Sequence, residues 1–173
     1  WRYGSDAMRE IWSEIYKRRL WRRIWVALAS VQAETGLVTE EQLLDAKENR
    51  YVAAVCHADG RWGLSLLDLS TGEFLTAERE TAAGVLDELA RLAPSELLLA
   101  EAAGEERQLT EELLPLLPSL CLTERPADHF HRGQAREQLT GHFGTINLAG
   151  FGCEGIEAGL AAAGGLFLYI QET

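Results

Sequence analysis

The sequence predicts an α/β fold, a mixed sheet in which an antiparallel meander is followed by parallel strands, with flanking helices and a long N-terminal α-helix. Three observations support this prediction. Between residues 51 and 77, apolar runs of strand length are separated by turn residues. After residue 80, leucine-rich segments with helical spacing alternate with short apolar strands. The first 36 residues have the apolar spacing and the terminal glycine of one helix.

The N-terminal segment is predicted to form one helix from about Asp6 to Thr35, with Gly36 as its end signal. Its apolar residues change face along the helix, so that it must pack against more than one neighbour. We therefore expect it to promote self-association into a homo-oligomer. The residues expected to mediate this contact are Trp12, Trp21, Ile24, Trp25 and Leu28.

Charge separates the chain into two parts, residues 1–36 and 37–173. The first part has seven Arg or Lys against four Asp or Glu, whereas the second has nine against 23. The basic runs Lys17–Arg19 and Arg22–Arg23 could neutralise nucleic-acid phosphates. A solvated helix face is the favoured interpretation, because the attached acidic part would repel a polyanion. We expect no direct nucleic-acid contact.

The second part opens with a short helix and a three-stranded meander. Thr39 and Gln42 have capping-box spacing, which predicts a helix to about Lys47. Strands are predicted over Tyr51–Cys56 and Trp62–Leu67, joined by a turn through Asp59 and Gly60. A third strand is predicted over Glu73–Ala77.

Helices and strands then alternate to the end of the chain. Helical spacing of leucines begins after Thr81 and ends before Pro94. The later predicted elements are a strand over Glu96–Ala100, a helix over Glu105–Leu114, a strand over Leu120–Thr123, and helices over Gln134–His142 and Glu157–Glu172. This order is typical of a ribonuclease-H-like mixed sheet.

The sequence argues against nuclease chemistry and against a cofactor. A nuclease of this architecture needs clustered carboxylates for two metal ions, but the first strand has no acid and Asp68 has no evident carboxylate partner. Gly150–Gly155 matches G-x-G-x-x-G, yet no βαβ unit surrounds it, so a glycine-rich turn is favoured over dinucleotide binding. His129 and His131 could bind metal, but loop histidines are favoured. We expect no catalytic residue, cofactor or metal.

Other features predict a cytoplasmic protein without a membrane segment. Cys56, Cys121 and Cys153 are far apart and odd in number, which predicts reduced, buried thiols. The longest apolar run, near Leu160–Ile170, is about half of the ~20 residues that a spanning helix needs. Small residues such as Gly159 and Gly164 in the last helix are expected to allow close packing.

Residues 37–173 resemble the connector domain of MutS DNA mismatch-repair proteins. The hallmark stretch is Leu67–Phe74, and it follows a similar opening at Thr39–Asp45. Further similar segments occur in the same order, at Leu89–Ala100, His142–Gly144, Gly150–Gly152, Ala162–Gly165 and Gln171–Thr173.

The resemblance implies a non-catalytic module that links the mismatch-reading domain to the rest of the clamp and contacts a MutL-type protein. Arg136, Glu137 and Gln138, on the predicted Gln134–Leu139 helix, are the candidate contact residues. The alternative is that they are merely exposed helix positions. The family's mismatch wedge and ATPase domain are absent from this sequence, so neither mismatch binding nor ATP hydrolysis is expected.

The first 36 residues instead resemble the N-terminus of adenylosuccinate lyase. The similar residues are Arg2–Ser5, Met8–Glu14 and Ala33–Val38. In that family an Arg-Tyr pair approaches the substrate phosphate, which corresponds to Arg2 and Tyr3. The lyase body is absent, so no lyase activity is expected. The two resemblances together suggest a chimera. The alternative function is therefore an engineered assembly whose N-terminal helix drives self-association.

Overall fold

The structure is a computed structural model of the chain, and it describes residues 8, 14–39, 42–43, 50–101 and 104–172. The chain divides into two compact units. One comprises Trp1–Arg50 with Asp68–Glu73, and the other Tyr51–Leu67 with Phe74–Thr173. The predicted boundary at residues 36–37 stays a prediction.

The first unit contains helix α2, Glu14–Glu34. Its end at Glu34 lies one residue before the predicted end at Thr35, and Gly36, the predicted end signal, has a φ of 73°, the left-handed conformation that favours glycine. The predicted capping box is also present: the Gln42 backbone N–H donates to Thr39 Oγ1 at 3.2 Å, and the Thr39 N–H donates to Gln42 Oε1 at 3.0 Å. The predicted start of α2 near Asp6, and the predicted helix end near Lys47, lie outside the described residues.

The second unit is built on a five-stranded sheet with the order β3-β2-β1-β4-β5. Its strands are β1 (Tyr51–Ala58), β2 (Arg61–Asp68), β3 (Glu73–Arg79), β4 (Glu96–Ala100) and β5 (Cys121–Arg125). β4 is parallel to both β1 and β5. The β1–β2 turn has positive φ at Asp59 (53°) and Gly60 (72°), as a two-residue antiparallel hairpin requires. The predicted mixed α/β sheet is therefore confirmed.

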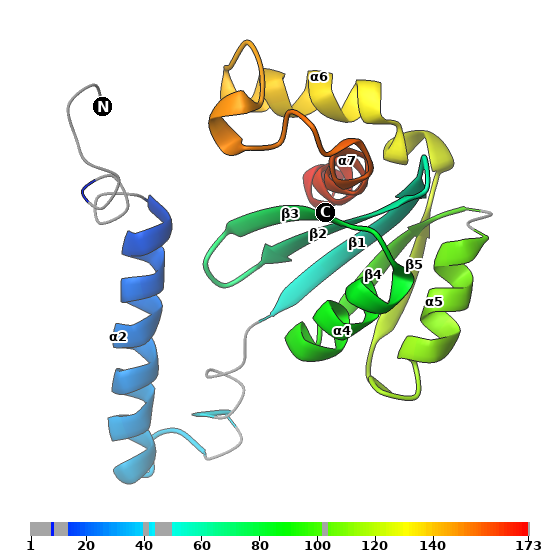
Figure 1. Ribbon diagram of the computed structural model, residues 1–173. Helices are drawn as coiled ribbons and strands as arrows, with labels where there is room; N and C mark the ends of the chain where they lie inside the picture. The colour runs from blue at the N-terminus through cyan, green and yellow to red at the C-terminus, as the bar shows by residue number, and fades with distance from the viewer. Residues whose placement is uncertain (1–7, 9–13, 40–41, 44–49, 102–103, 173) are drawn as a thin grey trace. The chain divides into compact units, whose positions relative to one another are not determined.

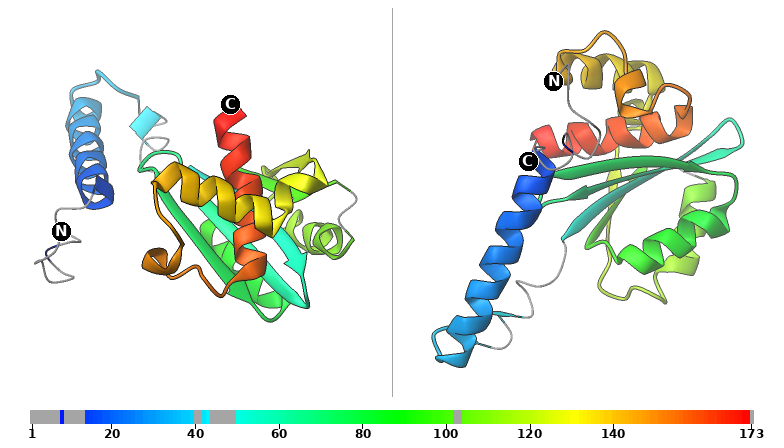
Figure 2. Two further views of the ribbon diagram at one scale, coloured as in Figure 1. Left: turned by 90° about the horizontal axis from the view of Figure 1, so that it is seen from above. Right: turned by 60° about the vertical axis from the view of Figure 1, so that its left-hand side comes forward.

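Helices cover both faces of this sheet (Figure 1; Figure 2). The helices are α4 (Ala82–Leu92), α5 (Glu105–Leu113), α6 (Arg132–Phe143) and α7 (Glu157–Glu172), with 3-10 turns η1 (Ala127–Phe130) and η2 (Ala149–Phe151). α4 and α5 pack on one face, and α7 packs on the other. Strand β1 contributes to the apolar core on both faces of the sheet, because successive side chains of a strand point to opposite faces. Ala53 and Val55 face α4 and α5, while Val52 and Ala54 face α7.

Helix α6 is the outermost layer, and it packs on α7 through Leu139 rather than on the sheet. Close approach depends on small residues, as predicted. A Cβ added to Gly164 would lie 2.4 Å from Ala135 Cβ, and one added to Gly63 would lie 1.9 Å from the Ala158 carbonyl oxygen. Residues 158–166 of α7 are all buried, which explains why this helix is apolar on every side.

The structure also differs from the sequence prediction. The η1 turn was not predicted, and α6 begins at Arg132 rather than near Gln134. The expectation of buried thiols is wrong for Cys121, which is exposed at the start of edge strand β5. Of the helices in the described part of the chain, none is long and apolar enough to cross a membrane.

Candidate partner-binding site

Helix α6 carries the predicted contact residues and presents most of its side chains to solvent. Only Ala135 and Leu139 are buried in it, one turn apart on the side that faces α7. Glycine ends the helix, because Gly144 adopts a left-handed φ of 62°. The helix is thus fixed by one narrow apolar edge and leaves a broad polar surface available for contact.

The three predicted contact residues have different surroundings. Arg136 is held within the unit: its Nη1 lies 2.8 Å from Glu154 Oε2, and its Nη2 lies 3.4 Å from Glu157 Oε1. Glu154 also accepts a hydrogen bond from the Leu148 backbone at 3.2 Å, so Arg136 ties α6 to the segment before α7. Glu137 is exposed and Gln138 is half-buried.

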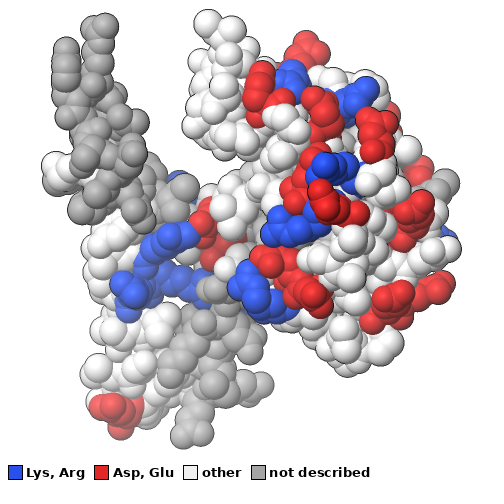
Figure 3. Space-filling view, in the orientation of Figure 1, with Lys and Arg blue, Asp and Glu red and all other residues white. Residues whose placement is uncertain are grey.

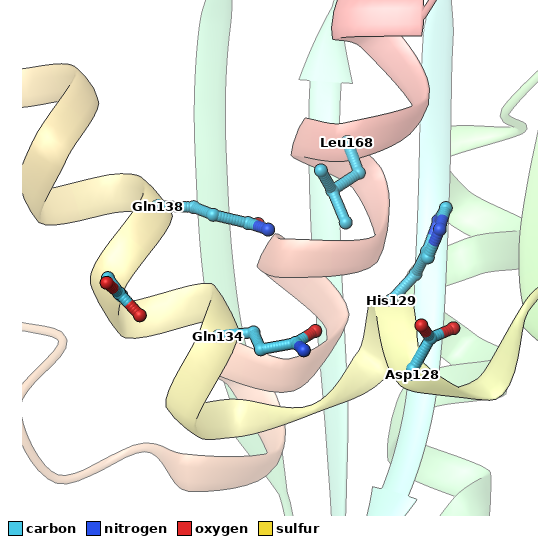
Figure 4. A pocket seen from close by; sticks show the side chains of 6 residues that line it. Asp128, His129, Gln134, Gln138 and Leu168 are labelled. Atoms are coloured by element: carbon cyan, nitrogen blue, oxygen red, sulfur yellow. The ribbon is translucent and has the colours of Figure 1, made fainter.

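Glu137 and Gln138 line a groove that also involves η1 and α7. Gln134 of α6, Asp128 and His129 of η1, and Leu168 of α7 complete its lining, and its volume is about 530 Å³. Figure 4 shows Gln134 and Gln138 reaching from α6 toward α7, with Asp128 and His129 on the opposite side of Leu168. The groove therefore contains two of the predicted contact residues and four residues that were not among them.

Asp128 was not predicted as a contact residue, and the neighbouring His129 and His131 were interpreted only as loop histidines. Pro126 immediately precedes the η1 turn and Asp128 lies in its first turn, and both proline and acidic residues are common at helix starts. A proline followed two residues later by an acid therefore indicated the start of a helical turn at this point of the sequence. His131 is exposed at the start of α6, whereas His129 is half-buried.

The described residues include no group of three or more His, Cys, Asp or Glu side chains that could hold a metal ion. Two buried acids near the sheet accept hydrogen bonds from backbone N–H groups. Glu106 Oε1 accepts the His57 backbone N–H at 2.7 Å, and Asp68 Oδ1 accepts the Ser70 N–H at 2.8 Å. The glycine-rich segment forms the η2 turn, with Gly152 at a φ of 73°, so the turn interpretation of that motif is confirmed.

The apolar residues of α2 that were predicted to mediate self-association are exposed where they are described. The exposed fractions are 55% for Trp21, 57% for Ile24, 67% for Trp25 and 46% for Leu28. Trp12 lies outside the described residues. Self-association stays a prediction.

Comparisons with known proteins relate most of the chain to one family. The family model for MutS domain II matches residues 50–173. A DNA mismatch repair protein MutS of Trichodesmium erythraeum is 41% identical over 147 residues, and one of Syntrophobacter fumaroxidans is 44% identical over 138. These alignments cover 80% and 79% of this chain, but only 16% and 15% of the relatives.

Among solved structures, Thermus thermophilus RuvC, described in complex with a Holliday junction substrate, is 14% identical with a TM-score of 0.42. That match covers 71% of this chain and 96% of the RuvC chain. The family match begins at residue 50, so it does not bear on residues 1–36. The resemblance of that segment to adenylosuccinate lyase, and the interpretation as a chimera, stay predictions.

Proposed function

The chain belongs to the MutS family through domain II, and we propose that it acts as the connector of a DNA mismatch-repair protein. In this proposal it is a non-catalytic unit that links neighbouring domains and offers a contact surface to a MutL-type protein. The chain spans about a sixth of the length of the MutS proteins that it matches. The MutL contact is therefore part of the proposal and is not inferred from the similarity alone.

The observation that carries the proposal is the position of α6. It is the outermost layer of the unit, and the groove along it is open to solvent. Glu137 and Gln138 supply side chains to this groove, while Arg136 holds the helix in place through Glu154 and Glu157. A surface helix fixed by its own ion pairs is preorganised, which lowers the entropic cost of binding.

The test is the affinity of the chain for a MutL-type protein, measured by biolayer interferometry. We expect the double substitution Glu137→Ala/Gln138→Ala to weaken binding about tenfold, which corresponds to ~1.4 kcal/mol and lies in the range of the minority of interface residues that contribute strongly to binding. A suitable control is Glu111→Ala/Glu112→Ala, which changes two exposed acids of α5 on the other face of the sheet.

Thermal unfolding shows whether the variants keep their fold. Substitutions of the exposed residues Glu111, Glu112 and Glu137 are each expected to change the free energy of unfolding by less than about 0.5 kcal/mol. Gln138 is half-buried, so the unfolding measurement has to show that the α6 variant keeps its fold. Equal affinities of the α6 variant, the α5 variant and the unchanged chain would contradict the proposed contact.

A further inference from the structure

The β2–β3 loop (Asp68–Glu73) carries two acids that differ in burial. Asp68 is only 3% exposed, whereas Glu73 is half-buried. Asp68 Oδ1 accepts the Ser70 backbone N–H at 2.8 Å, and the Asp68 carbonyl oxygen accepts the Gly72 N–H at 2.7 Å. These bonds fold the loop around Asp68. Its other carboxylate oxygen, Oδ2, needs a cation, because a buried charge without a partner is costly.

Helix α2 supplies this cation from within the same compact unit. Arg22 Nη1 lies 3.5 Å from Asp68 Oδ2 and also donates to Ser70 Oγ. Both members of the ion pair are withdrawn from solvent, with side-chain exposures of 16% for Arg22 and 4% for Asp68. Arg19 pairs with Glu73, and the Arg19 side chain is 49% exposed. The contact therefore combines a largely buried ion pair with a more exposed one.

A third arginine of α2 lies over the backbone of the loop at Gly72. A Cβ added to Gly72 would lie 2.5 Å from Arg18 Nη1, and the φ of Gly72 is 70°. Glycine therefore permits this turn and leaves room for the guanidinium. Arg18 and Arg19 precede Arg22 by four and three residues, which places all three on one side of the helix. The basic run of α2 is thus used by the chain's own loop.

Apolar burial contributes less to this contact than charge does. With 3.6 residues per turn, Ile24, Leu28 and Val31 fall on the side of α2 opposite to the three arginines. Their exposed fractions are 57%, 46% and 57%. Figure 3 shows the basic side chains of α2 gathered on one stretch of the helix, followed by a stretch without charge. The ion pairs are therefore the main attachment of α2 to the loop.

From these observations we propose that α2 is an electrostatic latch, which Arg18, Arg19 and Arg22 hold on the β2–β3 loop and which opens when its ion pairs are screened or removed. The loop lies within Leu67–Phe74, the hallmark stretch of the resemblance to MutS connectors. The latch thus determines whether α2 or another molecule contacts that stretch. Because it involves neither α6 nor a MutL-type protein, this inference is independent of the proposed function.

Hydrogen–deuterium exchange of the full chain, followed by mass spectrometry, tests the latch. Most of the stability of a helix in a protein comes from its packing, so release should also loosen α2. We expect Arg19→Glu to accelerate exchange of the α2 amides about three- to tenfold, because it replaces an ion pair by two like charges. Arg19→Glu/Glu73→Arg should restore slow exchange, because the pair forms again with its charges exchanged.

The matched control is Arg23→Glu, which makes the same charge change at another exposed position of α2 and should leave the exchange unchanged. Slow exchange of the buried strand β4 shows that each variant keeps the fold of the second unit.

Ionic strength tests the latch without a substitution. Raising NaCl from about 0.1 M to about 1 M shortens the Debye length from about 10 Å to about 3 Å. Exchange of the α2 amides should then become faster in the unchanged chain. Three results would overturn the latch: equal exchange of α2 in the Arg19→Glu and Arg23→Glu variants, no restoration in the charge-exchanged variant, or no effect of NaCl on the unchanged chain.

Discussion

The three cysteines show how burial changes the chemistry of one residue type. Burial, with a smaller contribution from the charge of Glu106, raises the pKa of Cys56 from its ordinary value of 9.0 to about 12. Burial and Glu154 also raise the pKa of Cys153, while Cys121 is exposed. Because the thiolate is the nucleophile, we expect iodoacetamide at pH 8 to alkylate Cys121 first, Cys153 next and Cys56 last. Mass spectrometry of the digested protein gives the order, and labelling of Cys56 as fast as Cys121 would contradict it. The raised pKa of Cys56 also makes stability depend on pH. Between about pH 9 and pH 12 the unfolded chain loses the Cys56 proton while the folded chain keeps it. The free energy of unfolding therefore falls as the pH rises through this range, and a Cys56→Ala variant should show a smaller fall.

At the scale of elements, local patterns predicted the scaffold, whereas the groove depends on contacts that no local pattern contains. The bounds of β4 and α7 were predicted to the residue, because an apolar run between Pro94 and Gly104, and a long helix of small and apolar residues, are visible in the sequence. The ion pairs of Arg136 join residues 18 and 21 positions apart, and such pairs follow only from the packing of α6 on α7. That packing yields a prediction for two glycines. A Cβ at Gly164 would lie 2.4 Å from Ala135 Cβ, whereas one at Gly141 would meet nothing within 4 Å. We expect Gly164→Ala to lower the free energy of unfolding by about 1–3 kcal/mol through overpacking. Gly141→Ala, on the exposed side of α6, should raise it by about 0.5–1 kcal/mol, because alanine favours helix. Urea unfolding measures both changes, and similar effects of the two substitutions would show that α6 does not pack closely on α7.

At the scale of the whole molecule, the described residues that form the buried core of the second unit all lie outside the N-terminal helix. The three apolar clusters of this unit draw their buried residues from positions 52–166. We therefore expect a truncated protein that begins at Leu37 to unfold cooperatively, with a midpoint close to that of the full chain. Assembly, unlike folding, is expected to depend on α2. Its exposed tryptophans form part of a large apolar surface, and exposure of such a surface to water is unfavourable. Sedimentation of the full chain should show a mass that rises with concentration, and the truncated protein should stay monomeric. A full-length variant with Trp21→Ser and Trp25→Ser serves as the control, because it keeps the helix and removes its most exposed aromatic surface. If this variant and the unchanged chain have the same mass at every concentration, these tryptophans do not drive assembly. If the truncated protein also associates, the contact surface lies in the second unit, and α6 with its groove becomes the first region to examine.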